Sequence, residues 1–380
     1  MFNLKKDFML DPSVTFLNHG SFGATPKPVF KEYQRWQREL ENQPVEFLSR
    51  RHNDLMLASR MALANYLGTK AENLVYVQNA TIGLNIVARS LNLKAGDEVL
   101  STNHEYGALD RTWRFLAKEK GFTYINQKVD LTSHDDSVKS FLAGVTANTK
   151  VIFLSHITSS TATIFPLEKI IQFAKSKNII TVIDGAHAPG QINLNLDSLN
   201  ADFYGGNLHK WLCAPKGAGF LYANPEKQHL LKPLIVSWGY EPETPSNSKF
   251  VDEHEWQGTR DIAAFLTVPQ AIAYQQEQDW ARVRSACHQL AVEAWNQIHQ
   301  LTKMNPLHAN PELWFAQMSV SSLPINTDVL SFKKKLYEDY RIEIPVVDWH
   351  GNKLIRLSVQ GYNSRQDINH LLQALKKLLN

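Results

Sequence analysis

Cysteine is scarce in this sequence of 380 residues, which contains only Cys213 and Cys287. Two cysteines cannot form a disulfide framework or a four-cysteine zinc site. A reduced, cytoplasmic compartment is therefore the expectation. Long hydrophobic runs are also missing: no stretch of about 18 apolar residues occurs, so we expect no membrane-spanning segment.

Neither sign of charge predominates, because 40 Lys and Arg oppose 37 Asp and Glu, a formal net charge of +3. No Lys/Arg-rich run of the kind that binds phosphate backbones is present, which argues against nucleic acid as a partner. Hydrophobic residues make up 43% of the chain, as in an ordinary globular protein. The length is enough for one large core and a second domain.

Seven short apolar runs alternate with longer amphipathic stretches between about residues 70 and 225. The predicted strands lie at 73–79, 97–103, 122–129, 150–157, 178–184, 201–206 and 217–223, and the predicted helices at 81–91, 107–121, 134–145 and 166–177. This alternation predicts an α/β fold with a mostly parallel, seven-stranded sheet covered by helices. The last two predicted strands lack a connecting helix, so one of them can run antiparallel.

A polar, proline-containing stretch at 239–256 interrupts this pattern. Beyond it, helices at 262–301, strands at 312–323 and 353–363 and a final helix at 364–380 predict a smaller α+β domain. We therefore expect an N-terminal segment at 1–25, a large domain at 26–260 and a small C-terminal domain at 261–380. The helix predicted at 27–44 would pack on the small domain or on a partner.

Two ionisable side chains stand in apolar surroundings near predicted strand ends, where the chemistry of α/β sheets collects. Asp184 ends the apolar run "NIITVID", and Lys210 lies between "YGGN" and the glycine-rich strand "GAGFLYA". A buried charge is costly without a partner of opposite sign. Pyridoxal 5'-phosphate needs both residue types, because its aldehyde forms a Schiff base with a lysine and its ring nitrogen needs a carboxylate to stay protonated.

The same cofactor also needs donors for its phosphate and a stacking partner for its ring. A helix N-terminus suits a phosphate, and "QNATIGLN" offers one, with Ala80 and Thr81 at the start of a predicted helix. The segment "NHEYGAL" follows the next predicted strand and brings His104 and Tyr106 to the same edge of the sheet.

Eight motifs, which include these candidate cofactor-binding residues, are spread over nearly the whole chain: "FLNHGSFGATP", "QPVEFLSRR", "NAT", "HEYGA", "VIDGAHAPG", "LHKWLCAPKGAGFLY", "QGTRD" and "RLSVQGYN". With them, the sequence resembles the class V aminotransferase family of fold-type-I pyridoxal-phosphate enzymes, and within it the isopenicillin N epimerase-like branch. The resemblance implies a large cofactor-binding domain, a smaller C-terminal domain, an amino acid substrate, and a homodimer whose active sites are completed across the interface. It also places the N-terminal segment near the active site.

The resemblance further implies roles for residues that match the family's motifs. Lys210 would carry the cofactor as a Schiff base and move the proton at the substrate Cα. Asp184 would pair with the ring nitrogen, His187 would bond the ring hydroxyl, and Tyr106 would stack on the ring.

The phosphate and the substrate have their own implied partners. Ala80, Thr81, Asn207 and His209 would hold the phosphate, together with Thr259 from the neighbouring subunit. Arg356 would bind the substrate carboxylate, and Asn18 and His19 would line the substrate site. Arg50 and Arg51 are predicted to be solvated or interface charges.

The reaction itself stays open at this stage, because epimerisation, transamination and β-elimination by a C–S lyase share the same first steps. Persulfide transfer is not expected, since "RIEIPVVDWHGNKLIR" lacks the cysteine that cysteine desulfurases carry there. Two alternatives from other classes are a non-catalytic, cofactor-binding regulator and a metal hydrolase that uses His104, Glu105, Asp184 and His187. The regulator would need a helix-turn-helix pattern that the first seventy residues lack.

Overall fold

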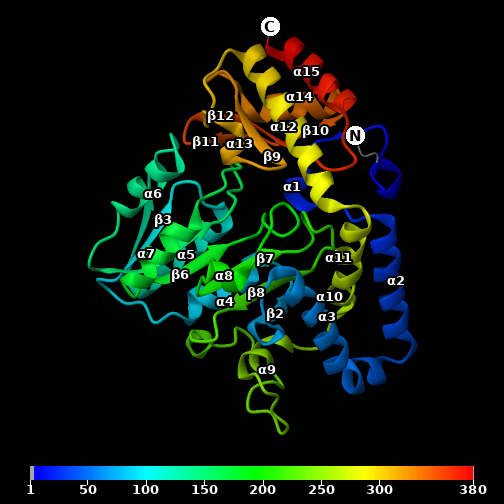
Figure 1. Ribbon diagram of the computed structural model, residues 1–380, viewed down its shortest axis with the longest axis vertical. Coiled ribbons are helices and arrows are strands. Elements are labelled where there is room, and N and C mark those ends of the chain that lie inside the picture. Colours follow the sequence, from blue (N-terminus) through cyan, green and yellow to red (C-terminus); the bar gives the residue numbers. More distant parts are fainter. Residues whose placement is uncertain (1–3, 380) are drawn as a thin grey trace.

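A seven-stranded sheet forms the centre of the larger part of the molecule in the computed structural model, which describes residues 4–379 (Figure 1). Its strands are β2 (Leu74–Val77), β3 (Glu98–Thr102), β4 (Thr123–Gln127), β5 (Thr149–Ser155), β6 (Ile180–Asp184), β7 (Phe203–Asn207) and β8 (Gly219–Ala223). They follow the order β2-β8-β7-β6-β5-β3-β4. Only β8 runs antiparallel to its neighbours, so the mostly parallel sheet is confirmed, and one of its last two strands is indeed reversed.

Both faces of this sheet are buried, as is usual for parallel strands. Along β5, Ile152 and Leu154 pack into one hydrophobic cluster, whereas Val151 and Phe153 pack into the other. The covering helices are α4 (Ala80–Ser90), α5 (Gly107–Lys120), α6 (His134–Leu142), α7 (Leu167–Ser176) and α8 (Leu196–Leu199). Helix α4 begins at Ala80 because the Asn79 side chain accepts the N–H of Ile82, as an N-cap residue does.

A second, three-stranded antiparallel sheet lies at the other end of the molecule, with β12 (Asn352–Ser358) between β11 (Val346–Trp349) and β9 (Met318–Ser322) (Figure 1). It is accompanied by α12 (Trp280–Thr302), α14 (Val329–Glu338) and α15 (Arg365–Leu379). The predicted strand at 312–323 is wrong in its first part, which is helix α13 (Pro311–Trp314). Pro311 at the first helical position and the Asn310 cap favour that short helix.

The N-terminal part of the chain joins the two regions. Strand β1 (Thr15–Phe16) pairs with β10 (Ile342–Glu343), and α1 (His19–Phe22) lies between the two sheets (Figure 1). Helix α2 (Lys27–Asn42) contacts α10 (Ala263–Leu266) and α11 (Val268–Glu277), and α3 (His52–Leu67) contacts the same pair. Helix α2 therefore packs on two helices that lie beyond residue 260 in the sequence.

Shorter elements complete the chain: η1 (Lys5–Asp7), η2 (Glu46–Arg50), η3 (Ala71–Asn73), η4 (Gln228–Leu230) and α9 (Lys249–Glu255). Helix α9 lies inside the stretch at 239–256 that the sequence pattern left irregular, and Ser248 caps it.

The domain boundaries at residues 25 and 260 stay predictions. No helix among residues 4–379 is long and apolar enough to cross a membrane.

Candidate active site

A cavity of about 480 Å³ opens where β5, β6 and β7 end, and we call it the strand-end cavity. Parallel strands bring their carboxyl ends to one edge of the sheet, which is why residues far apart in sequence meet there. Eight of the predicted site residues line it: Ala80, Thr81, Tyr106, Asp184, His187, Asn207, His209 and Lys210. The remaining lining residues include Ser21, Phe22, Ser155 and Ser159.

Asp184 and Lys210 lie in this cavity as a pair of interacting charges. Burial raises the pKa of Asp184, while the Ala186 N–H, which donates to Asp184 Oδ1 at 2.9 Å, and the Lys210 charge oppose that shift. Burial lowers the pKa of Lys210 to about 7, against the opposing effect of Asp184. Lys210 is therefore a partly neutral amine near neutral pH, and a neutral amine is a nucleophile.

His187 contacts Lys210 directly, with 3.1 Å between His187 Nε2 and Lys210 Nζ. Its other ring nitrogen, Nδ1, accepts the indole N–H of Trp211 at 3.2 Å. Burial lowers the pKa of His187 well below its usual value, and the nearby Lys210 charge adds to that effect. The ring is therefore neutral.

The N-terminus of α4 faces the same cavity. Ala80 N–H donates to Asn207 Oδ1 at 2.8 Å, and Ile82 N–H donates to Asn79 Oδ1 at 3.0 Å. Thr81 lies between them, and within residues 4–379 its N–H and hydroxyl meet no hydrogen-bond acceptor. An anion at this helix end would thus be held by Thr81.

His209 lines the cavity beside this helix end. Its Nδ1 lies 3.2 Å from the Ala218 carbonyl oxygen, to which it donates. Burial lowers the pKa of His209 to about 4. The neutral ring therefore presents a bare Nε2, and His209 could donate to a phosphate only after that nitrogen takes up a proton.

Arg356 stands directly behind the cavity wall. Its two terminal nitrogens donate to the Ser159 carbonyl oxygen at 2.6 Å and to the Ser21 hydroxyl at 2.9 Å, and both serines line the cavity. The Nε of Arg356 is buried and has no hydrogen-bond partner in the described chain. Burial lowers the pKa of Arg356 to about 10, and no carboxylate of residues 4–379 forms an ion pair with it. A buried guanidinium of this kind suits an incoming carboxylate.

Other predicted residues lie outside the cavity lining. His19 is fully buried behind Lys210, with Nε2 3.0 Å from the Lys210 carbonyl oxygen and Nδ1 3.0 Å from the Tyr362 hydroxyl. Asn18 Oδ1 accepts a hydrogen bond from the Ser21 hydroxyl at 2.5 Å. Asn18 therefore holds Ser21, which lines the cavity, and does not line the cavity itself. Thr259 is exposed on a loop away from its own chain's cavity.

Three contributors were missed by sequence reasoning, namely Ser21, Ser159 and Trp211, and Glu105 was considered there only as a metal-site candidate. Ser21 and Trp211 lie inside the motifs quoted above, but motif membership does not say which side chain they contact. Glu105 accepts hydrogen bonds from Thr102 Oγ1 at 2.6 Å and from Ser155 N and Oγ at 2.9 and 2.6 Å. Burial and the neighbouring Asp184 raise the pKa of Glu105 to about 7.

The metal-hydrolase alternative finds no geometric support. Across residues 4–379, no three His, Cys, Asp or Glu side chains gather in a way that could hold a metal ion. His104 is buried with Nδ1 2.8 Å from the Thr161 hydroxyl. Both cysteines are buried, and burial raises the pKa of each thiol to about 12, which is unsuited to persulfide chemistry.

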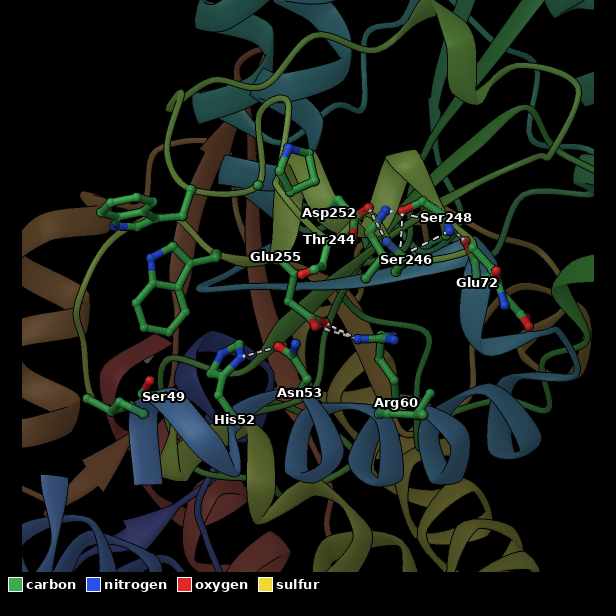
Figure 2. Close-up of a pocket in the computed structure, with 18 residues that line it drawn as sticks. Ser49, His52, Asn53, Arg60, Glu72, Thr244, Ser246, Ser248, Asp252 and Glu255 are labelled. Atoms are coloured by element: carbon green, nitrogen blue, oxygen red, sulfur yellow. Dashed lines mark hydrogen bonds and ion pairs between the residues drawn. The ribbon is translucent and has the colours of Figure 1, made fainter. Parts of the chain in front are cut away.

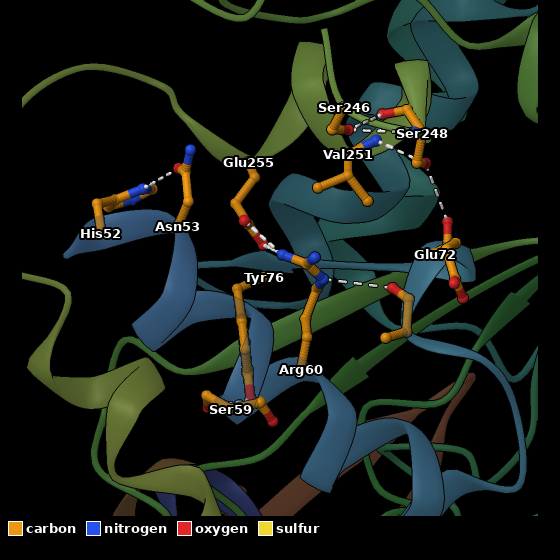
Figure 3. A network of polar contacts seen from close by, with 11 residues as sticks. His52, Asn53, Ser59, Arg60, Glu72, Tyr76, Ser246, Ser248, Val251 and Glu255 are labelled. Carbon is orange, nitrogen blue, oxygen red and sulfur yellow. Dashed lines mark hydrogen bonds and ion pairs between the residues drawn. The ribbon is translucent and has the colours of Figure 1, made fainter. Parts of the chain in front are cut away.

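A larger cavity, of about 670 Å³, lies between α3 and α9 and shares no lining residue with the strand-end cavity (Figure 2). Arg60 and Glu255 point toward each other across it and form a buried ion pair. Arg60 Nε also donates to the Ala71 carbonyl oxygen at 3.3 Å. Below Arg60, Ser59 contacts Tyr76 (Figure 3). None of the predicted site residues lines this larger cavity.

Comparison with known proteins identifies the family. The model of the family described as Aminotransferase class-V matches residues 16–371. The chain belongs to this family. Isopenicillin N epimerase of Amycolatopsis lactamdurans is 35% identical, over 99% of this chain and 98% of that protein, and its counterpart of Streptomyces clavuligerus is 32% identical, over 97% and 96%. The hercynylcysteine sulfoxide lyase of Schizosaccharomyces pombe is 25% identical, over 98% and 96%.

A solved structure supports the fold. The cystine C–S lyase C-DES in complex with cysteine persulfide superposes with a TM-score of 0.86 at 23% identity, over 96% of this chain and 98% of that chain. The predictions of a class V aminotransferase-family enzyme, of the fold-type-I architecture and of pyridoxal 5'-phosphate as cofactor are confirmed. The residues present fit that cofactor, since Lys210 offers an amine, Asp184 a carboxylate and Thr81 free phosphate donors.

Proposed function

We propose that this enzyme moves a proton at the Cα of an amino acid substrate in the manner of isopenicillin N epimerase, as an epimerase or an aminotransferase. The observation that carries the proposal is the partly buried Lys210, whose amine lies in one cavity with Asp184 and 3.1 Å from His187. The two epimerases that are 32–35% identical to this chain support the branch.

Pyridoxal phosphate, when bound, supplies an aldehyde that condenses with amines and a ring that withdraws electrons from the substrate Cα. Asp184 would hold the proton on the ring nitrogen, because its buried carboxylate needs a cation. Lys210 would anchor the cofactor and then take and return the Cα proton. His187 would face the ring hydroxyl, and Tyr106, which is 42% exposed at the cavity, would cover the ring.

The phosphate of the cofactor would lie at the N-terminus of α4. Thr81 would donate its amide and hydroxyl there, and Asn207 would hold Ala80 in place through its 2.8 Å hydrogen bond. His209 would join them once protonated beside the dianion.

The substrate carboxylate would bind at Arg356, whose fork is oriented by Ser21 and Ser159. Asn18 and His19 would then contribute indirectly. Asn18 fixes Ser21, and His19 fixes the backbone of Lys210.

A C–S lyase that acts on a cysteine conjugate is the second candidate. It is favoured by the hercynylcysteine sulfoxide lyase and by the putative L-cysteine desulfhydrase 1 of Oryza sativa, which is 27% identical over 97% of this chain. Elimination would use the same residues to remove the Cα proton. It would differ in releasing a group from Cβ, so it needs no proton donor on the opposite face.

The decisive experiment follows three products from a panel of amino acids and cysteine conjugates. Chirality at Cα reports epimerisation, an α-keto acid with the same side chain reports transamination, and pyruvate with a released thiol reports elimination. A protein that binds pyridoxal phosphate but releases pyruvate alone would replace the first candidate with the second. A colourless protein that takes up no cofactor would refute both.

The homodimer is also part of this proposal. Thr259 lies outside its own cavity, and the segment at 234–240 exposes apolar side chains, among them Val236 and Trp238, the latter 85% exposed. Mixing inactive Lys210→Ala and Thr259→Ala proteins should restore activity if each cavity uses its partner's Thr259. Light scattering that shows an active monomer would contradict the homodimer.

The cytoplasmic location, which rests on the low cysteine content, stays a prediction.

A further inference from the structure

The hydrogen bond between Trp211 and His187 determines which nitrogen of His187 carries the proton. An indole nitrogen can only donate, so His187 Nδ1, 3.2 Å away, must present a lone pair. The buried ring is neutral and carries a single proton. That proton is therefore on Nε2.

This tautomer has a consequence for Lys210. His187 Nε2 lies 3.1 Å from Lys210 Nζ, and a protonated Nε2 can only donate. A neutral amine has a lone pair that accepts this hydrogen bond, whereas an ammonium has none and would place two N–H groups against each other. The contact is favourable only while Lys210 is unprotonated.

We propose that Trp211 is a positioning residue that fixes the Nε2–H tautomer of His187 and thereby favours the neutral, nucleophilic amine of Lys210. The inference goes beyond the proposed function, because it concerns the free amine of Lys210 in the cofactor-free protein, where His187 Nε2 lies 3.1 Å from it.

The surroundings hold both rings in this arrangement. Trp211 is completely buried, and its carbonyl oxygen accepts the Gln275 side-chain amide at 2.8 Å. The loop that carries His187 lies so close to Trp211 that a Cβ on Gly190, whose φ is +86°, would meet the Trp211 carbonyl carbon at 2.3 Å. Gln191 in turn donates to the His187 carbonyl oxygen at 2.8 Å.

Other charges also act on this pair, and none of them belongs to Trp211. Burial is the main reason for the low pKa of Lys210; Asp184 opposes it and Arg356 adds to it. His187 is also near Arg356, His209 and His19. The effect of Trp211 can therefore be measured as a difference between variants.

The tautomer can be read directly by ¹⁵N NMR on the full chain labelled at histidine, with the His187 signals assigned by their loss in His187→Gln. We expect a protonated Nε2 and a bare Nδ1. The opposite tautomer, or a doubly protonated ring at pH 7, would overturn the proposal. This measurement needs only the unmodified protein, so it does not depend on how well a Trp211 variant folds.

The effect on Lys210 can be measured by reductive methylation with formaldehyde and cyanoborohydride, after hydroxylamine has removed any bound aldehyde. Only the neutral amine reacts, so the rate at Lys210, read by peptide mass spectrometry across pH, reports its protonation. In Trp211→Phe, His187 can expose a bare Nε2 to the ammonium. The midpoint should then rise by roughly 0.5 to 1 pH unit, the equivalent of one hydrogen bond.

The matched control is Trp280→Phe, which removes a buried indole hydrogen bond to the Gly190 carbonyl oxygen but none to His187. Its midpoint should equal that of the wild type. In a His187→Leu background, Trp211→Phe should cause no further shift. An unchanged midpoint in Trp211→Phe, or the same shift without His187, would refute the proposal. A failure to bind pyridoxal phosphate would refute the proposed function and leave this result intact.

Discussion

The side chain of Asn207 accepts the amide N–H of Ala80 at 2.8 Å, which joins the end of β7 to the start of α4. The first amide of the helix is thus already used within the protein. Thr81, the next residue, keeps its amide and hydroxyl directed to the strand-end cavity. An anion bound at this helix end would therefore meet the N–H of Thr81 and not that of Ala80.

Thr81→Ala should weaken the binding of pyridoxal phosphate. The hydroxyl is lost while the amide remains, and one hydrogen bond to a charged group contributes about 1.5–3 kcal/mol. We expect the dissociation constant, measured by absorbance titration, to rise at least about tenfold. Thr112→Ala is the control, because Thr112 does not line the cavity and its hydroxyl donates to the Ala108 carbonyl oxygen. Equal affinities in both variants would contradict the assignment.

Lys210 should be the residue that carries the cofactor. The purified protein should be yellow, and borohydride should fix the cofactor on the peptide that contains Lys210. Lys210→Ala should bind cofactor without a covalent bond and be inactive. Lys216→Ala is the matched control, since Lys216 lies in the same turn but donates to the Gly23 carbonyl oxygen. Label on any other lysine of the wild type would count against Lys210.

Replacing Asp184 with Asn or Ala should lower the catalytic rate by about 10²–10³, the size of effect seen when one preorganised electrostatic partner is lost. The carboxylate would no longer hold the proton on the ring nitrogen. Asp202→Asn serves as the control, because Asp202 is an equally buried carboxylate that accepts Thr181 N–H away from the cavity. Near wild-type turnover in Asp184→Ala would show that Asp184 does not have this role.

Arg356→Ala should lower kcat/KM for amino acids by roughly ten- to a hundredfold, because a hydrogen-bonded charge pair is lost. Arg356→Lys keeps the charge but not the planar fork, so it should recover only part of the activity. The measurement compares an amino acid with its decarboxylated amine. If a folded Arg356→Ala protein keeps the wild-type preference for the carboxylated form, Arg356 does not bind the carboxylate.

Glu105 should make stability depend on pH. Its pKa is raised to about 7 in the folded protein, so the folded state binds a proton between about pH 4.5 and 7 that the unfolded chain releases. This contribution to stability is fully present below about pH 4.5 and is lost as pH rises through about 7. Relative to Glu105→Gln, the wild type should lose up to about 1.4 kcal/mol of unfolding free energy per pH unit in that window. Urea denaturation curves at pH 5, 6 and 7 measure this difference, and a constant difference would contradict it.

Much of the fold could be predicted because its signals are local. The seven apolar runs match the strands, and most of them do so because a parallel strand buried on both faces reads as a continuous hydrophobic run. The missing helix before β8 indicated that one of the last two strands could run antiparallel, and the structure shows that it is β8. The misassigned segment around α13 shows the limit, because an apolar run of a few residues fits a strand or a buried helix equally well.

Some residues of the candidate site could likewise be predicted from the sequence, whereas others could not. Asp184 and Lys210 could be found from the sequence, because an ionisable residue in an apolar loop at a strand end is conspicuous. His19 could not be placed: its motif suggested the substrate site, yet packing puts it behind Lys210. Glu105 appeared only as a metal-site candidate, and its three hydrogen bonds with Ser155 and Thr102 depend on the pairing of distant strands.

By itself, the sequence determined the alternation of strands and helices, the family, and the residue types that pyridoxal phosphate requires. The tertiary structure alone decided which of these groups share a hydrogen bond. Asn207 takes the amide of Ala80, Ser21 orients Arg356, and Trp211 sets the proton of His187. Patterns along a chain report burial and local conformation, whereas hydrogen bonds depend on positions within a few tenths of an ångström. Those positions are fixed only when the whole core has packed.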